Sequence, residues 1–184
     1  RVLLAEDNDI NQIVATEILK MKGITVDVAS NGLEAVDMAR SGAYDVILMD
    51  IEMETVDAGI RAAEIISAIH PDIKIIFLTA HETDDMITSA MGTGAVDYVV
   101  KGCEDERLLE HIRRASQGRA ELEPKIQNTV MQEYARLRRS ERSLIFFINN
   151  VAHLTPAEHE LVKLLLQDKK VAEIARLRCV EVVT

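Results

Sequence analysis

The chain has 184 residues, of which 48% are hydrophobic and only 3% are aromatic, so aliphatic side chains must build the core of one large or two smaller domains. Its formal net charge of −10 argues against attraction of the whole chain to nucleic acid. Its two cysteines lack C-x-x-C spacing, which gives no indication of a zinc site or disulfide scaffold and favours a cytoplasmic location. No apolar run approaches ~20 residues, so we expect no membrane span.

Charge is distributed unevenly along the chain. Residues 1–106 carry a net charge of −14, residues 107–143 a net charge of +4, and residues 144–184 are balanced. This change of sign predicts an acidic first domain followed by a mildly basic connector. The chain starts at Arg1, without a signal peptide, and stops at Thr184, and we expect that it is trimmed at both ends.

The first two-thirds of the chain alternates between short apolar runs and amphipathic runs. The apolar runs predict buried β-strands at 2–5, 25–29, 45–49, 73–78 and 96–100. The amphipathic runs predict helices at 10–22, 33–40, 60–69, 84–91 and 104–116. This alternation is typical of a doubly wound α/β fold, in which helices cover both faces of a five-stranded parallel sheet. The first strand–helix turn, A-E-D-N-D, lacks the glycines of a dinucleotide-binding loop.

Four of these strands end on residues that suit a phosphate and metal site. The first ends in Glu6 and Asp7, the third in Asp50, the fourth in Thr79 and the fifth in Lys101. Because parallel strands end at one edge of a sheet, we expect these side chains to converge. Carboxylates with open positions suit Mg²⁺, a central aspartate can attack phosphorus, and an ammonium and a hydroxyl can bind phosphoryl oxygens.

Two further residues accompany this group. Ala80 is small and would leave the approach to the phosphate open, whereas Tyr98, three residues before Lys101, could move between inward and outward positions. Each residue also has an ordinary alternative, since a strand-end aspartate such as Asp7 or Asp50 can cap a helix and a lysine can lie on the surface. The coincidence of all of them at strand ends favours a common site.

Beyond residue 117 the pattern is helical. Residues 121–142 combine an apolar stripe with a basic flank, which predicts a connecting helix whose basic run is either a solvated face or a dimer or phosphate-contacting surface. Thr155, followed by Pro156 and Glu158, predicts a capped helix start. A short second helix is expected at 170–177, then a turn and the first residues of a third helix at 181–184.

The first 117 residues resemble the receiver domain of two-component response regulators. The matching segments are, in order, L-L-A-E-D-N, V-I-L-M-D-I, F-L-T-A and D-Y-V-V-K. The resemblance implies a flavodoxin-like receiver fold with Asp50 as the phosphoacceptor. It also implies Mg²⁺ as the cofactor, held by Glu6, Asp7, Asp50 and the backbone carbonyl of Glu52.

The same resemblance implies that Thr79, Lys101, Ala80 and Tyr98 form the phosphate-binding and switch group, with Thr79 and Tyr98 moving together after phosphorylation. Nearby hydroxyl and ammonium groups would reorient toward the ~1.5–2 negative charges of a phosphoryl group. A sensor histidine kinase would be the phosphoryl donor.

Residues 154–184 resemble the start of the helix-turn-helix output domain of the LuxR/NarL class, through L-T-P-A-E-H-E-L-V, A-E-I-A and V-V-T. The expected domains are therefore a receiver at 1–117, a helical linker at 118–150 and an output domain at 151–184. We expect the recognition helix to be missing after Thr184, so the DNA-contacting residues are unknown and DNA binding would require the complete output domain.

Three positions depart from the family pattern. Glu54 follows Met53 where a proline is usual, the stretch Asp57-Ala58-Gly59 is shifted by one residue, and Gly102 follows Lys101 where many relatives carry proline. We expect the first change to loosen the loop beside Asp50 and to add negative charge near it, with altered phosphorylation kinetics as one outcome.

The favoured function is a phosphorylation-switched transcription regulator that forms a phosphorylation-dependent homodimer, does not bind membranes and has no enzymatic activity beyond its own phosphorylation and dephosphorylation. One alternative is a receiver whose C-terminal helices bind protein. Another is an aspartate-nucleophile phosphatase, although Glu52 stands where such enzymes tend to carry a second aspartate. Glu52 and His81 would border the path of attacking water and set the lifetime of the phosphoaspartate.

Overall fold

The computed structural model describes residues 1–151, 154–167 and 169–177. Its elements follow the predicted alternation closely, with boundaries shifted by up to two residues in the first 117 residues. They are β1 (Val2–Ala5), α1 (Asp9–Met21), β2 (Val26–Ala29), α2 (Gly32–Ser41), β3 (Val46–Met49), α3 (Ala58–Ile69), β4 (Lys74–Thr79), α4 (Asp84–Gly92), β5 (Asp97–Val100), α5 (Asp105–Ser116), α6 (Pro124–Val151), α7 (Pro156–Leu166) and α8 (Val171–Leu177).

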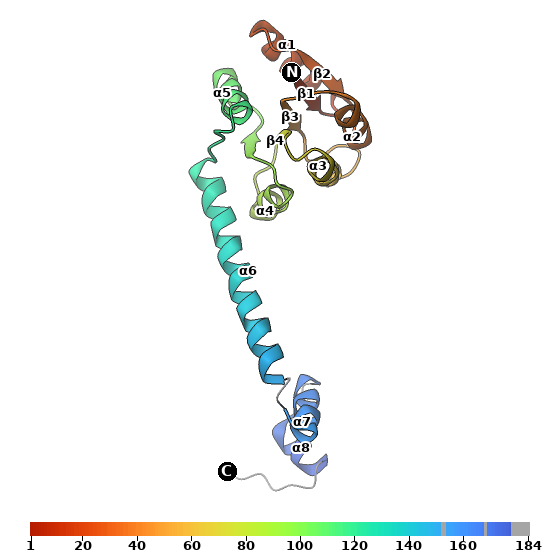
Figure 1. The fold of residues 1–184 in the computed structure, drawn as a ribbon, viewed down its shortest axis with the longest axis vertical. Helices are drawn as coiled ribbons and strands as arrows, with labels where there is room; N and C mark the ends of the chain where they lie inside the picture. The colour runs from red at the N-terminus through yellow and green to blue at the C-terminus, as the bar shows by residue number, and fades with distance from the viewer. Residues whose placement is uncertain (152–153, 168, 178–184) are drawn as a thin grey trace. The chain divides into compact units, whose positions relative to one another are not determined.

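The strands form one parallel sheet in the order β2-β1-β3-β4-β5. Helices α2, α3 and α4 contribute to the buried cluster on one face of the sheet, and α1 and α5 to the cluster on the other (Figure 1). The predicted doubly wound α/β fold is therefore confirmed. In a sheet of this order, ligands bind outside the carboxyl ends of the strands where the winding reverses, which here is between β1 and β3.

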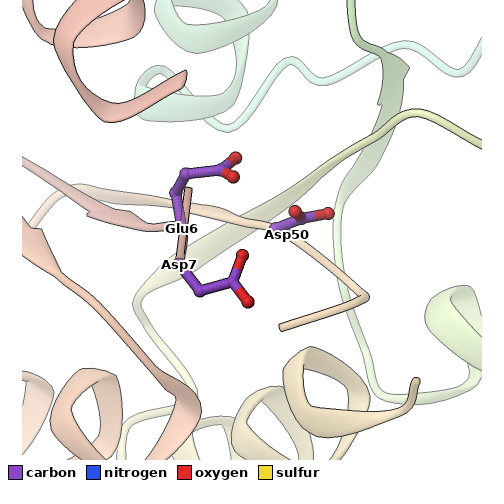
Figure 2. A group of neighbouring side chains, drawn as sticks. All are labelled: Glu6, Asp7 and Asp50. Carbon is purple, nitrogen blue, oxygen red and sulfur yellow. The ribbon is translucent and has the colours of Figure 1, made fainter. Parts of the chain in front are cut away.

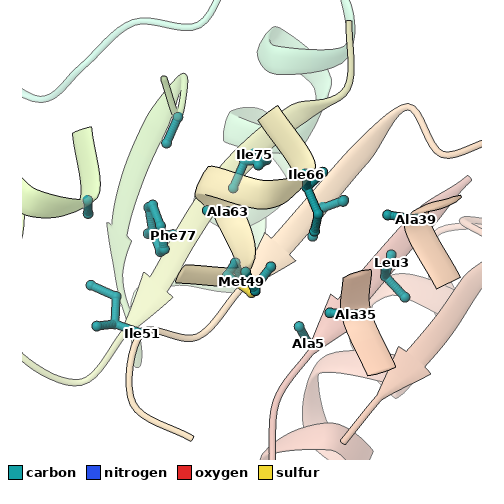
Figure 3. Packing of buried hydrophobic residues seen from close by; sticks show 14 of the residues in the cluster. Leu3, Ala5, Ala35, Ala39, Met49, Ile51, Ala63, Ile66, Ile75 and Phe77 are labelled. Carbon is teal, nitrogen blue, oxygen red and sulfur yellow. The ribbon is translucent and has the colours of Figure 1, made fainter. Parts of the chain in front are cut away.

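Aliphatic side chains form both layers of the core, as the low aromatic content requires. Leu3 and Met49 pack toward α2 and α3, where Ala35, Ala63 and other small residues let the helices approach the sheet (Figure 3). Alternate strand residues point to the opposite face, toward α1 and α5. Burial on both faces fixes the register, and the register places Ala5 beside Met49 and Thr79 beside Val100. The residues that follow these pairs therefore meet at one edge.

Contacts divide the chain into two compact units, Arg1–Glu133 and Tyr134–Thr184, with the boundary inside α6. The predicted connecting helix is longer than residues 121–142, since it runs from Pro124 to Val151. The expected domain limits at residues 117 and 150 remain a prediction.

In the second unit, α7 starts as predicted with a capping box, in which the Thr155 hydroxyl accepts from the Glu158 N–H and the Glu158 carboxylate accepts from the Thr155 N–H. The expected second helix is α8, whereas the expected turn at 178–180 and third helix at 181–184 lie outside the described residues. Among the described helices, none has both the length and the apolarity needed to cross a membrane.

Candidate phosphate and metal site

Three carboxylates from two strand ends converge at the carboxyl edge of the sheet. Glu6 and Asp7 follow β1, Asp50 follows β3, and one oxygen from each lies within 4.8 Å of the others (Figure 2). Glu6 and Asp50 are only 3% and 6% exposed, whereas Asp7 is open to solvent. Buried acids at this spacing repel one another, so the site needs positive charge.

Lys101 supplies that charge from the end of β5. Its Nζ lies 2.5 Å from Asp50 Oδ2 and 2.6 Å from Glu6 Oε2. Its side chain is 20% exposed, so the surface-lysine alternative is wrong. Burial raises the pKa of Asp50, against the hydrogen bond and charge of Lys101, and the charge of Glu6 raises it further. Burial works against the Lys101 ammonium, but Asp50 and Glu6 outweigh it and raise the pKa of Lys101.

The polar residues at the start of α1 hold Glu6 in place. Asn11 Nδ2 donates to Glu6 Oε1 at 3.0 Å, and Gln12 Nε2 donates to the Glu6 carbonyl at 2.6 Å. Asn8 is the N-cap of α1, so the helix-cap alternative for Asp7 is wrong. The N-cap of α3 is Asp57, which removes the same alternative for Asp50. Sequence reasoning missed Asn11 and Gln12, whose only signal is their position one turn after Glu6.

The two proposed switch residues meet at one loop residue, His81. Thr79 is buried and its Oγ1 accepts a hydrogen bond from the His81 N–H at 3.3 Å. Tyr98 is 1% exposed and its hydroxyl donates to the His81 carbonyl at 2.7 Å. Burial raises the pKa of Tyr98 to about 12, so this hydroxyl keeps its proton. The structure thus places Tyr98 inward and joins both side chains to the β4–α4 loop.

The remaining predicted residues lie around this core. Ala80 is exposed, and Glu52 is partly exposed with Oε2 3.5 Å from His81 Nε2. These two side chains thus connect the loop after β3 to the loop after β4. The role of the Glu52 carbonyl as a metal ligand stays a prediction.

The structure gives physical reasons for the departures near Asp50. The Glu54 carboxylate accepts from the Gly32 N–H at the start of α2, with both oxygens 3.2 Å away. This carboxylate is therefore held at the start of α2, and the expectation that Glu54 adds negative charge near Asp50 stays a prediction. In place of the missing proline, backbone bonds from Met53 and Ala58 to the Thr55 carbonyl hold the loop.

The shifted glycine has a packing reason. A Cβ at Gly59 would lie 1.8 Å from the Asp50 carbonyl oxygen, so only glycine lets α3 approach this backbone. Gly102 has φ +85°, a left-handed conformation that proline, with φ near −65°, cannot adopt. The turn after Lys101 therefore differs locally from the usual one.

The donor set fits Mg²⁺, which prefers carboxylate and water oxygens. Glu6, Asp7 and Asp50 offer oxygens only, and Asp7 is exposed enough to leave room for water and substrate oxygens. The single ammonium of Lys101 balances one of three carboxylates. The cluster thus retains the negative charge that a divalent cation needs.

Comparisons with known proteins agree with this geometry. A model of the response regulator receiver domain matches residues 2–113. The chain is 34% identical over 178 residues to the transcriptional regulatory protein LiaR of Bacillus subtilis, covering 95% of this chain and 80% of LiaR. It is 30% identical to the transcriptional regulatory protein DegU of Brevibacillus brevis over 139 residues, which are 74% of this chain but only 58% of DegU.

Among solved structures, the chain is similar to the response regulator protein TrrA of Thermotoga maritima in complex with Mg²⁺ and BeF. The identity is 33% and the TM-score 0.58, over 62% of this chain and 97% of TrrA.

Proposed function

The chain belongs to the response regulator family, as the receiver domain match and the likeness to LiaR show, and from this premise we propose that it accepts a phosphoryl group on Asp50 from a sensor histidine kinase. One observation carries the proposal. Lys101 and two further carboxylates surround Asp50 at the carboxyl edge of the sheet. The structure of TrrA with Mg²⁺ and BeF supports the same chemistry by likeness.

In the proposed step, a carboxylate oxygen of Asp50 attacks phosphorus. The new P–O bond forms as the P–N bond to the donor histidine breaks, and the donor nitrogen keeps the electron pair and takes up a proton. Mg²⁺, held by Glu6, Asp7 and Asp50, would neutralise negative charge on the phosphoryl oxygens.

The residues of the chain then adjust to the new charge. Lys101, now 2.5 Å from Asp50 Oδ2, is close enough to move onto a phosphoryl oxygen. The Thr79 hydroxyl accepts from the His81 N–H and can donate its own hydrogen to the phosphoryl group. Water attack on the acyl phosphate would return Asp50 to its free form. We propose that self-phosphorylation and self-dephosphorylation are the only reactions that the chain carries out.

The experiment is incubation with acetyl phosphate and Mg²⁺, followed by intact mass measurement. We expect one added phosphoryl group, absent from Asp50→Asn and from samples with excess EDTA. Labelling that persists in Asp50→Asn would refute the phosphoacceptor. Sustained hydrolysis of p-nitrophenyl phosphate would instead favour the phosphatase alternative.

We propose that the output is transcription regulation, because LiaR and DegU are both transcriptional regulatory proteins by name. Helices α7 and α8 would belong to a DNA-binding domain, and phosphorylation would promote a homodimer. A cytoplasmic location, expected from the cysteine usage, is part of the same proposal.

The test of this output uses a chain extended to the length of these relatives. It should bind duplex DNA with an affinity that falls steeply with salt. Its mass by light scattering should rise on phosphorylation. An extended chain without DNA affinity at low salt would favour protein binding by the C-terminal helices.

A further inference from the structure

The first turns of α6 dock against the β4–α4 loop, to which both switch residues, Thr79 and Tyr98, are hydrogen-bonded through His81. Lys125 Nζ lies 2.6 Å from Glu82 Oε2, and the Thr129 hydroxyl donates to Asp84 Oδ1 at 3.0 Å. Glu82 lies in the β4–α4 loop and Asp84 is the first residue of α4. Two polar contacts thus join residues more than 40 positions apart, within the unit that contains the sheet.

An apolar contact supports the same docking. Ile126 is 1% exposed and belongs to the buried cluster that contains Ile87, Ala90 and Tyr98. Leu122 and Val130, four residues before and after Ile126, also pack against this cluster. The start of α6 is therefore held by buried area as well as by surface charge, and buried area supplies more free energy than an exposed ion pair.

A short chain of bonds leads from the phosphate-binding hydroxyl to this helix. Thr79 Oγ1 accepts from the His81 N–H, and Tyr98 donates to the His81 carbonyl. The next residue, Glu82, binds Lys125. If the Thr79 hydroxyl turned away from His81 to reach a phosphoryl group, the His81 N–H would lose its acceptor, and the backbone that positions Glu82 would shift.

We infer that the start of α6 is a latch that is docked while Asp50 is unmodified and released by phosphorylation. This inference rests on the proposed function and names the element that reads the modification. Coupling between two events is reciprocal, so the factor by which phosphorylation weakens the docking of α6 equals the factor by which undocking favours phosphorylation. The α6 helix is also the covalent connection to α7 and α8, so its release is available to the output.

The test measures the affinity of the full chain for Mg²⁺ with beryllofluoride, an analogue of the phosphoryl group. Lys125→Glu breaks the ion pair with Glu82, and we expect about two- to fivefold tighter binding, the range of an exposed pair. Simple electrostatics predicts the opposite, since the substitution adds negative charge near an anion. Lys22→Glu, which changes the same charge on an exposed lysine after α1, should not tighten binding.

Two more variants separate the latch from side effects. The double variant Glu82→Lys/Lys125→Glu swaps the two charges and so restores the ion pair. Its affinity for Mg²⁺ with beryllofluoride should return toward that of the original chain. Ile126→Ala changes no charge and should tighten binding by about tenfold or more, because a buried side chain is lost from the docked state. Hydrogen exchange of residues 122–130 should rise when beryllofluoride is added, and should be high in Lys125→Glu without it.

The outcomes distinguish the inference from the proposed function. If Asp50 is phosphorylated but Lys125→Glu and Ile126→Ala both bind beryllofluoride like the original chain, the latch is refuted and the phosphoacceptor stands. If the original chain neither binds beryllofluoride nor gains a phosphoryl group, both fall together. Tighter binding in Lys22→Glu would show an effect of overall charge and would also overturn the latch.

Discussion

His111 Nδ1 lies 2.6 Å from Asp97 Oδ2, and both side chains are buried. The pair joins α5 to β5, next to Tyr98, whose N–H donates to the other carboxylate oxygen of Asp97. The hydrogen bond to Asp97 raises the pKa of His111 above its ordinary 6.5, against its burial. Glu123, 3.9 Å from Nε2, adds to the rise, and Arg107 opposes it. The pair ties the last strand to the last helix of the receiver.

This pair predicts that stability falls as pH rises. A folded-state pKa above the unfolded value means that the native state holds the proton more tightly. The stabilisation is complete below pH 6.5 and is lost as pH rises through the folded pKa of His111. We expect urea unfolding to give a higher free energy of unfolding at pH 6 than at pH 9. His111→Gln should lower the free energy of unfolding by about 1–3 kcal/mol at pH 6 and flatten its pH dependence. An unchanged pH dependence in His111→Gln would assign the effect to another titrating group.

Lys101→Met should destabilise the chain and make its stability depend more on Mg²⁺. The substitution leaves the buried carboxylates of Glu6 and Asp50 without their ammonium partner, at a cost of about 1–3 kcal/mol. A bound cation would recover part of this loss by mass action. Urea unfolding with and without Mg²⁺ measures both effects. Equal Mg²⁺ stabilisation of both proteins would contradict the view that the lysine and the cation neutralise the same cluster.

Gly59→Ala should be strongly destabilising. The new Cβ would meet backbone atoms of Asp50 and Ile51 at 1.8–3.0 Å, and backbone cannot move aside as a flexible side chain does. We expect a loss of about 3 kcal/mol or more, at or above the usual cost of overpacking, with weaker phosphorylation because Asp50 shifts. Gly92→Ala is the matched control, since nothing lies within 4 Å of its Cβ, and it should be neutral or slightly stabilising. Thermal unfolding compares the two.

Replacing both Glu52 and His81 with alanine should shorten the lifetime of the phosphoaspartate. Their side chains approach to 3.5 Å between the two loops beside the site, and we expect them to restrict the approach of water to a phosphorylated Asp50. We expect about three- to tenfold faster loss of the phosphoryl group, the effect of roughly 1 kcal/mol on the barrier. Intact mass followed over time after removal of acetyl phosphate gives the rate. Glu64→Ala, on exposed α3 surface, controls for charge, and an unchanged lifetime in the double variant would dispose of the idea.

The order of the elements and the group at the strand ends could be predicted from the chain alone. Short aliphatic runs alternate with helical periodicity, and that pattern admits few folds other than a doubly wound parallel sheet. Parallel strands all end at the same edge of the sheet, whatever side chains pack around them. That edge must therefore carry the residues that follow β1, β3 and β5, which are Glu6, Asp50 and Lys101. The capping box at Thr155 is equally local, since all its partners lie within four residues.

Only the tertiary structure decided which partners these side chains take. His81 as the shared partner of Thr79 and Tyr98, Glu54 at the start of α2, and Lys125 on Glu82 all join residues from different elements. Periodicity predicts which face a residue occupies, but not the angle or register at which two elements pack. Those depend on side-chain volumes across the whole core, as the contact of Gly59 with the Asp50 backbone illustrates.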